Sequence, residues 1–213
     1  MKFGVIGLGR FGFQVATTLA ENGMEVLGVD MSESIVSSIR DFITYAVCIQ
    51  VANEQTLRSI GMDEMETVVV AMGENFAESI LITAILKKKL HIPKVITRAV
   101  NDIHKEILML IGADKVVLPE HEIGQKLADN LSLPFNAITR ISKDFSIAQI
   151  PVSGKMIGKK VHELSFIKEH HATCLGVKQK ETIVPPYEIG ALHEKDILII
   201  AGTNKDLARI SNG

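Results

Sequence analysis

Three glycines near the N-terminus restrict the fold of this chain more than any other feature. Gly7, Gly9 and Gly12 have the spacing G-x-G-x-x-G, and they join an apolar, strand-like run to a helix-like segment. The first glycine permits a tight turn, the second lets the backbone approach a diphosphate, and the third allows a helix to pack closely on a sheet. Phosphates bound there would lie on the N-terminus of the following helix. The segment therefore predicts a Rossmann-type domain that binds an adenosine-diphosphate moiety.

The second strand-like run ends at Asp30, about 20 residues beyond the glycines, where an acidic side chain accepts hydrogen bonds from the ribose hydroxyls. Its charge would repel a 2′-phosphate, and no arginine follows it at Met31, Ser32 or Glu33. An NADP-type ligand is therefore disfavoured, whereas ATP, ADP and NAD(H) remain open. Ser32 is also the expected N-cap of the next helix.

Arg10 lies inside the glycine segment, at the first turn of the expected helix. A guanidinium there adds positive charge beside the phosphates, and it would favour a ligand with more negative charge, such as ATP. An exposed arginine at a helix start, with no ligand role, explains the residue equally well.

Short apolar runs alternate with helix-like segments as far as residue 133, which predicts an α/β fold with a doubly wound parallel sheet. Consecutive β-branched residues, as in Val68–Val70, indicate strands that are covered on both faces. A last helix is expected from Pro119 to about Leu131. The glycines expected to end helices are Gly23, Gly61 and Gly112. The expected strands are Lys2–Ile6, Glu25–Val29, Tyr45–Ile49, Thr67–Ala71, Val95–Thr97 and Lys115–Leu118.

A different pattern follows the expected domain boundary near Leu133. Residues 136–213 predict a small α+β domain, so that the first domain spans residues 1–133. The second domain is too small for the substrate pocket and lid that most dehydrogenases place opposite their nucleotide domain. Its expected strands and helix are Ser146–Val152, Ala172–Val177, Ile197–Ala201 and the helix Val161–Phe166.

The charge balance argues against a nucleic-acid partner. The chain has 23 Lys and Arg against 25 Asp and Glu, a formal net charge of -2, and therefore no general positive field. No apolar run reaches the roughly 18 to 20 residues that span a bilayer, and the first residues do not have the pattern of a signal peptide. We therefore expect a cytoplasmic protein in which Cys48 and Cys174, each in an apolar stretch, are reduced and buried.

Beyond the glycine segment, the chain resembles the RCK regulators, also called KTN or TrkA-N plus TrkA-C, of bacterial Ktr and Trk potassium uptake systems. The resemblance covers nearly the whole length, and the small second domain agrees with it. Its most distinctive part is Ile111–Asp114 followed by Pro119 and Glu120, for which ordinary dehydrogenases have no need. The other matching segments are Val5–Gly12, Val26–Asp30 and Val70–Asn75.

The resemblance implies an RCK-N Rossmann domain, a crossover helix near Glu122 to Leu133 that contacts a second subunit, and a ligand-binding RCK-C domain. It implies a regulatory subunit without enzymatic activity that controls a membrane potassium transporter. ATP or ADP, or alternatively NAD(H), would bind at the glycine segment. Homodimers would assemble into an octameric ring at the inner face of the membrane. Cyclic di-AMP is the second ligand that the resemblance suggests, at the C-terminal domain.

The same resemblance implies a set of site residues. Those expected at or near the phosphates are Gly7, Gly9, Arg10, Phe11, Gly12, Arg98 and Glu120. Those expected at the ribose and the base are Asp30, Met31, Ser32, Gln50, Ala71, Met72, Gly73, Glu74 and Asn75. Glu120 is implied to help hold a divalent cation, Mg²⁺ or Ca²⁺, near the phosphates at the dimer interface, although a glutamate at a helix start also complements the helix dipole. The chain departs from the family at Ile49–Ala52, where Gly-Asp-Ala-Thr is common; Gln50 can hydrogen-bond a base but carries no charge.

Three other functions compete with this interpretation. An NAD-dependent oxidoreductase needs a general acid near the nicotinamide. The candidates, all expected at the surface or at helix ends, are His91, His104, His121 and Lys126. A metal-binding module is suggested by His170, His171 and Cys174, although structural zinc normally takes four ligands and no second pair is near. A sensor that acts alone, without a channel, is the third alternative.

Overall fold

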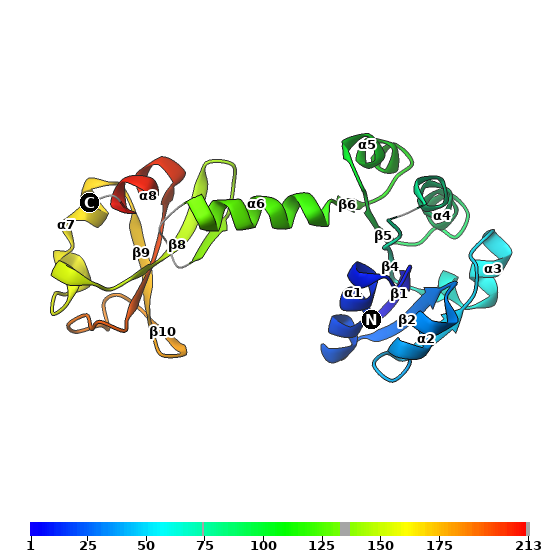
Figure 1. The fold of residues 1–213 in the computed structure, drawn as a ribbon, viewed down its shortest axis with the longest axis horizontal. Coiled ribbons are helices and arrows are strands. Elements are labelled where there is room, and N and C mark those ends of the chain that lie inside the picture. The colour runs from blue at the N-terminus through cyan, green and yellow to red at the C-terminus, as the bar shows by residue number, and fades with distance from the viewer. Residues whose placement is uncertain (74, 133–136, 212–213) are drawn as a thin grey trace. The chain divides into compact units, whose positions relative to one another are not determined.

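The computed structural model describes residues 1–73, 75–132 and 137–211, which belong to two compact units, Met1–Pro119 and Glu120–Gly213 (Figure 1). Each unit has its own sheet and its own apolar core. Most of the helix α6 (Pro119–Ser132) belongs to the second unit, which begins at Glu120. The predicted boundary near Leu133 lies outside the described residues and stays a prediction.

A six-stranded sheet, parallel throughout, forms the centre of the first unit in the order β3-β2-β1-β4-β5-β6. Its strands are β1 (Lys2–Ile6), β2 (Glu25–Asp30), β3 (Tyr45–Cys48), β4 (Thr67–Val70), β5 (Lys94–Arg98) and β6 (Lys115–Val117). Its helices are α1 (Arg10–Glu21), α2 (Glu33–Ile39), α3 (Glu54–Ser59), α4 (Phe76–Lys88) and α5 (Asp102–Leu110), with a 3-10 turn at Met62–Glu64. This strand order reverses between β1 and β4, the place where ligands bind in doubly wound sheets. The predicted Rossmann-type fold is confirmed.

Strand β4 illustrates why the sheet is internal, because all of its residues are buried. Side chains alternate between the two faces of a strand. Val68 and Val70 accordingly pack in one apolar cluster with Ile82 of α4, whereas Val69 packs in another with Ala16 of α1. The expectation that helices cover both faces is therefore correct.

Glycines in the left-handed region end the expected helices. The φ angles of Gly23, Gly61 and Gly112 are 79°, 76° and 102°. After Gly112, the N–H of Ala113 donates to the carbonyl oxygen of Leu108 at 3.1 Å, which satisfies a carbonyl in the last turn of α5.

The second unit is built on a five-stranded antiparallel sheet in the order β10-β9-β11-β8-β7. Its strands are β7 (Ala137–Arg140), β8 (Phe145–Pro151), β9 (Thr173–Gln179), β10 (Thr182–Val184) and β11 (Ile197–Thr203). Its helices after α6 are α7 (Ser165–Glu169) and α8 (Asn204–Ser211), with 3-10 turns at Gly154–Met156 and Val161–Glu163. The apolar core includes Leu198, Ile200 and Leu207. The predicted small α+β domain is confirmed.

Helix α6 is anchored to this sheet by polar contacts at its C-terminal end. The carboxylate of Asp129 accepts two hydrogen bonds from the guanidinium of Arg140, at 3.0 and 2.6 Å. The side chain of Asn130 accepts another from the N–H of Ile138 at 3.0 Å. These contacts join α6 to β7.

The prediction that both cysteines are buried is wrong for Cys48, which is exposed, and only partly right for Cys174, which is half-buried. Cys48 ends β3, which lies at the edge of the sheet and has one neighbouring strand, β2. An apolar run at a sheet edge is covered less than one in the middle. Across the described residues, no helix is long and apolar enough to cross a bilayer.

Candidate nucleotide-binding site

The turn between β1 and α1 is shaped by the first and third glycines. Gly7 has a φ of 89°, and its N–H donates to the carbonyl oxygen of Val29 at 2.8 Å. A Cβ added to Gly7 would approach Met72 Cγ to 2.9 Å, and one added to Gly12 would collide with the carbonyl oxygen of Gly7. The tight turn and the close helix packing expected of these two glycines are therefore present.

Gly9 has different surroundings. A Cβ added to it would meet no heavy atom of the described residues within 4 Å. Gly9 is also the N-cap of α1 and supplies no side-chain cap to the first N–H groups of the helix. A helix start of this kind has unpaired donors and a partial positive charge. Open space beside such donors fits a phosphate group.

Asp30 holds the glycine loop in place. Its Oδ2 accepts a hydrogen bond from the N–H of Leu8 at 2.7 Å, and its Oδ1 accepts one from the N–H of Ser32 at 2.9 Å. A carboxylate has about four lone-pair sites, so both oxygens can still accept from ribose hydroxyls. This ordering of the loop is a role that sequence reasoning missed. Ser32 occupies the N-cap position of α2 as expected, but its side chain makes no capping bond and lies 2.9 Å from Ser34 Oγ.

The loop after β4 lies against the glycine loop. Ala71 is buried, and its N–H donates to the carbonyl oxygen of Ile6 at 2.8 Å. Gly73 lies against Arg98, since a Cβ at Gly73 would collide with the guanidinium. Arg98 is the last residue of β5, so the structure brings a positive side chain to the carboxyl ends of β4 and β5. These positions surround the reversal of strand order, where nucleotides bind in this fold.

The remaining predicted site residues are distributed around these loops. Asn75 is the N-cap of α4: its Oδ1 accepts from the N–H of Glu78 at 3.2 Å, and its Nδ2 donates to Glu78 Oε2 at 2.9 Å. Arg10, Met31 and Gln50 are exposed after β1, β2 and β3 respectively, and Phe11 is half-buried on α1. Glu120, exposed in the first turn of α6, falls in the second unit, and Glu74 lies outside the described residues.

Among the acid–base candidates, the expectation that His104 lies at the surface is wrong, because this side chain is buried. Its ring packs on Phe76 with 4.1 Å between the ring centroids, and burial lowers the pKa of His104. His91, His121 and Lys126 are exposed, as expected. His104 lies four residues before the buried Leu108 on α5, and this helical spacing is the signal that could have revealed its burial.

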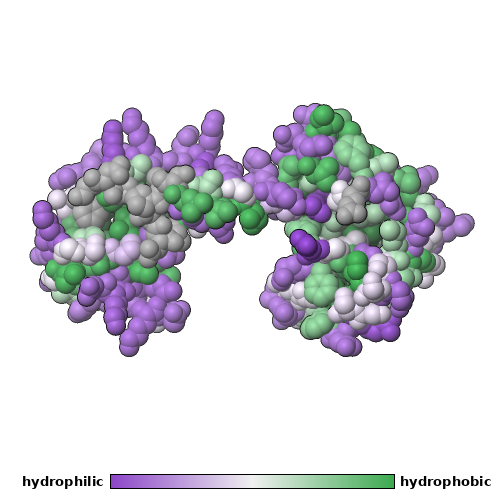
Figure 2. All heavy atoms as spheres, viewed as in Figure 1, coloured by the Kyte–Doolittle hydropathy of each residue, from purple (hydrophilic) through white to green (hydrophobic). Residues whose placement is uncertain are grey.

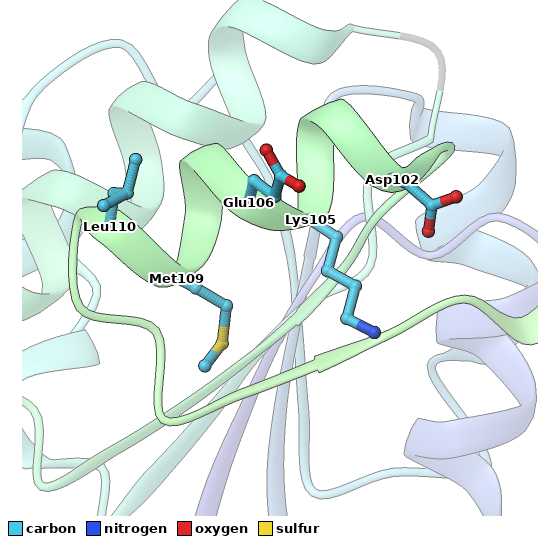
Figure 3. Close-up of a pocket in the computed structure, with 5 residues that line it drawn as sticks. All are labelled: Asp102, Lys105, Glu106, Met109 and Leu110. Atoms are coloured by element: carbon cyan, nitrogen blue, oxygen red, sulfur yellow. The ribbon is translucent and has the colours of Figure 1, made fainter.

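In the described part of the chain, no group of three or more His, Cys, Asp and Glu side chains converges as metal ligands. Figure 3 shows a hollow on the solvent-facing side of α5, and no predicted nucleotide residue is among those that line it. Its lining residues are Asp102, Lys105, Glu106, Met109 and Leu110.

Comparison with known proteins gives one family and several relatives. A sequence model of the TrkA-N domain matches residues 3–119. The Ktr system potassium uptake protein A of Bacillus subtilis (strain 168) is 36% identical over 214 residues, which covers 99% of this chain and 96% of that protein.

Two solved structures of GsuK are similar in fold. The GsuK channel bound to NAD has a TM-score of 0.67 at 17% identity, over 98% of this chain and 38% of that chain. GsuK bound to ADP has a TM-score of 0.53 at 25% identity, over 61% of this chain and 33% of that chain.

Proposed function

We propose that this chain, which belongs to the TrkA-N domain family, is a nucleotide-sensing regulatory subunit of a potassium uptake transporter. The observation that carries the proposal is the loop between β1 and α1, where open space beside Gly9 adjoins an uncapped helix start. Asp30 orders this loop from the end of β2. A relative that shares nearly the whole chain is a Ktr system potassium uptake protein, which supports the assignment to potassium uptake.

ATP and ADP are the proposed ligands, with NAD(H) as the alternative. The helix start and Arg98 offer positive charge for phosphates, and Asp30 offers acceptors for ribose hydroxyls. The structures of GsuK with NAD and with ADP support an adenine nucleotide in a protein of similar fold.

Sensing requires that two ligands bind two conformations with different affinities, and the shift cannot exceed that difference. ATP differs from ADP by the γ-phosphate and its cation. The exposed guanidinium of Arg10 is suited to the added negative charge. Glu120 is the proposed ligand for Mg²⁺ or Ca²⁺ at the phosphates, because both ions prefer carboxylate oxygens and this side chain is exposed.

Exposed apolar side chains on two helices support self-association. Ile123, Leu127 and Leu131 repeat every four residues along α6 and are 65%, 57% and 78% exposed, and Figure 2 shows apolar atoms along this helix. On α5, Ile103 and Leu110 are also exposed. We assign α6 to the homodimer contact and α5 to the contact between dimers, because a closed octameric ring of dimers needs two different interfaces.

The ring would lie in the cytoplasm, at the inner face of the membrane, through contact with a membrane transporter subunit. Cyclic di-AMP is the proposed ligand of the second unit. Leu175 and Ile183, which are exposed on β9 and β10, would help this unit pair with a copy and form a site between subunits.

The relationship to potassium uptake proteins over the full length confirms the prediction of a non-enzymatic protein and counts against the oxidoreductase. Incubation with NADH and a panel of carbonyl compounds should produce no substrate-dependent loss of NADH absorbance. Such a loss would restore the oxidoreductase interpretation.

Calorimetric titration of the purified chain with ATP, ADP, NAD and NADH tests the nucleotide site. Asp30→Ala should weaken binding, since each hydrogen bond to its charged carboxylate is worth about 1.5 to 3 kcal/mol at most. Asp41→Ala, at an exposed acid in the same unit, is the matched control and should bind normally. Undiminished affinity in Asp30→Ala would refute the role of Asp30 at the ribose.

A further inference from the structure

His104 connects the two loops that flank the candidate site. Its ring packs on Phe76, and its Nδ1 accepts a hydrogen bond from the N–H of Val100 at 3.4 Å. Phe76 is the first residue of α4, directly after the loop that contains Gly73. Val100 belongs to the loop after β5, close behind Arg98. One side chain therefore contacts both segments that hold the Gly73–Arg98 contact.

These contacts require a neutral ring. Nδ1 needs its lone pair to accept from Val100, so the ring proton is on Nε2. The side chain is fully buried, with 0% exposed, and Nε2 has no hydrogen-bond partner among the described residues. A buried donor without a partner is costly. An apolar ring of similar size would fill the same space without that cost, so packing alone does not explain a histidine here.

We propose that His104 is a positioning residue of the nucleotide site, which holds the start of α4 against the loop after β5. The inference rests on the proposed nucleotide site. Gly73 and Arg98 lie in close contact, since a Cβ at Gly73 would meet the guanidinium unless the arginine side chain moved. A shift of either loop would therefore displace the positive charge at the carboxyl ends of β4 and β5. Nucleotide affinity depends on this placement.

His104→Phe separates positioning from packing. The variant keeps an aromatic ring against Phe76 and removes the unpaired Nε2–H, but it loses the acceptor for the N–H of Val100. Loss of the bond to Val100 is offset by removal of the buried Nε2–H, which has no partner among the described residues. We expect a Tm equal to or above that of the wild type. Calorimetry should show ATP affinity reduced about fivefold, the size expected when one neutral hydrogen bond that orders the site is lost.

Ile92→Ala is the matched control. Ile92 is buried between the end of α4 and the start of β5, and Phe76 and Arg98 lie at the opposite ends of these two elements. The cavity should lower the Tm while ATP affinity, measured well below the Tm, stays at the wild-type value. The proposal is supported if His104→Phe loses more ATP affinity than Ile92→Ala although its Tm is the higher of the two.

Two results would overturn the inference. If His104→Phe binds ATP as tightly as the wild type, His104 does not position the site. If affinity follows the Tm in both variants, His104 contributes only to stability. Failure of the wild-type chain to bind any adenine nucleotide would instead refute the proposed site itself, so the two failures are distinguishable.

Discussion

Gly9 is the N-cap of α1 and Gly12 lies in the first turn of that helix, yet the two glycines have opposite surroundings. The space beside Gly9 is open, whereas Gly12 lies against the carbonyl oxygen of Gly7. Gly9 has a φ of -62°, which any L-residue adopts easily. Gly12 is therefore explained by the packing of α1 on β1, and Gly9 is not explained by the protein's own atoms. A phosphate bound at the proposed site would account for the second glycine.

Alanine at these two positions should therefore have different effects. Gly12→Ala should destabilise the first unit by about 1 to 3 kcal/mol, because the backbone must move to admit the Cβ. Gly9→Ala should leave stability unchanged or raise it by about 0.4 to 1 kcal/mol, since alanine at a compatible φ restricts the unfolded chain. Its ATP affinity should nevertheless fall. Chemical denaturation and calorimetry measure the two effects, and normal ATP binding by Gly9→Ala would contradict a phosphate at that position.

Arg10→Ala tests whether the terminal phosphate is recognised in the glycine loop. If Arg10 contacts the γ-phosphate, the variant should lose more affinity for ATP than for ADP, by about tenfold for one charge-assisted hydrogen bond. Arg40→Ala removes an exposed arginine elsewhere in the same unit and should change neither affinity. Equal losses for ATP and ADP in Arg10→Ala would make Arg10 a general anion contact and remove it as the source of discrimination.

At the scale of elements, the segment Ile111–Asp114 joins α5, β6 and the sheet. Gly112 ends α5, Ala113 is buried, and Asp114 binds the neighbouring strand. The Asp114 carboxylate accepts hydrogen bonds from the N–H of Val95 at 2.6 Å and from Lys87 Nζ at 2.9 Å. Partial burial opposes the charge of Asp114, but these bonds together hold its pKa below the ordinary 3.8. The segment that distinguishes this family from dehydrogenases thus has a structural role in the first unit.

Asp114→Asn should lower the free energy of unfolding at pH 7 by about 1 kcal/mol, a value reduced by solvent screening because the carboxylate is partly exposed. Because the folded pKa is lowered, the stabilisation by Asp114 is complete above pH 3.8. It is lost as the pH falls below 3.8 and the carboxylate is protonated. The stability difference between the wild type and Asp114→Asn should therefore shrink in acid. A difference that is constant down to pH 2.5 would contradict this account.

The elements that could be predicted from the sequence are those marked by a short pattern of neighbouring residues. Strand β4 contains three consecutive valines, and the helix-ending glycines act through their own φ angles, so both could be recognised without tertiary information. Burial depends on neighbours that are distant in sequence. Cys48 is exposed because β3 is an edge strand, and the strand order is not visible in a local apolar run. The contact of Arg98 with Gly73 likewise depends on the pairing of β4 with β5.

At the scale of the whole molecule, the exposed apolar side chains of α6 form the surface that we propose to be covered by a partner. A homodimer is the simplest partner, because a twofold axis lets the same stripe cover itself. The stripe lies on a helix that Asp129 and Asn130 anchor to the second unit. A contact between two copies of α6 would therefore bring two C-terminal units into one assembly, with Glu120 at the start of each helix.

Leu127→Glu tests this assembly in the full-length chain. Leu127 is 57% exposed, so the substitution should leave the fold intact, whereas a carboxylate in an apolar contact is strongly unfavourable. Burial contributes about 1.5 to 3 kcal/mol per leucine and a twofold contact contains Leu127 twice, so the dissociation constant of this contact should rise by at least about a hundredfold. Light scattering at micromolar concentration should then show a mass well below that of the wild-type assembly. Gln125→Glu adds the same charge on α6 outside the stripe and should keep the wild-type mass. If Leu127→Glu keeps the wild-type mass, α6 is not the dimer contact, and the place of Glu120 in a cation site shared between subunits loses its support.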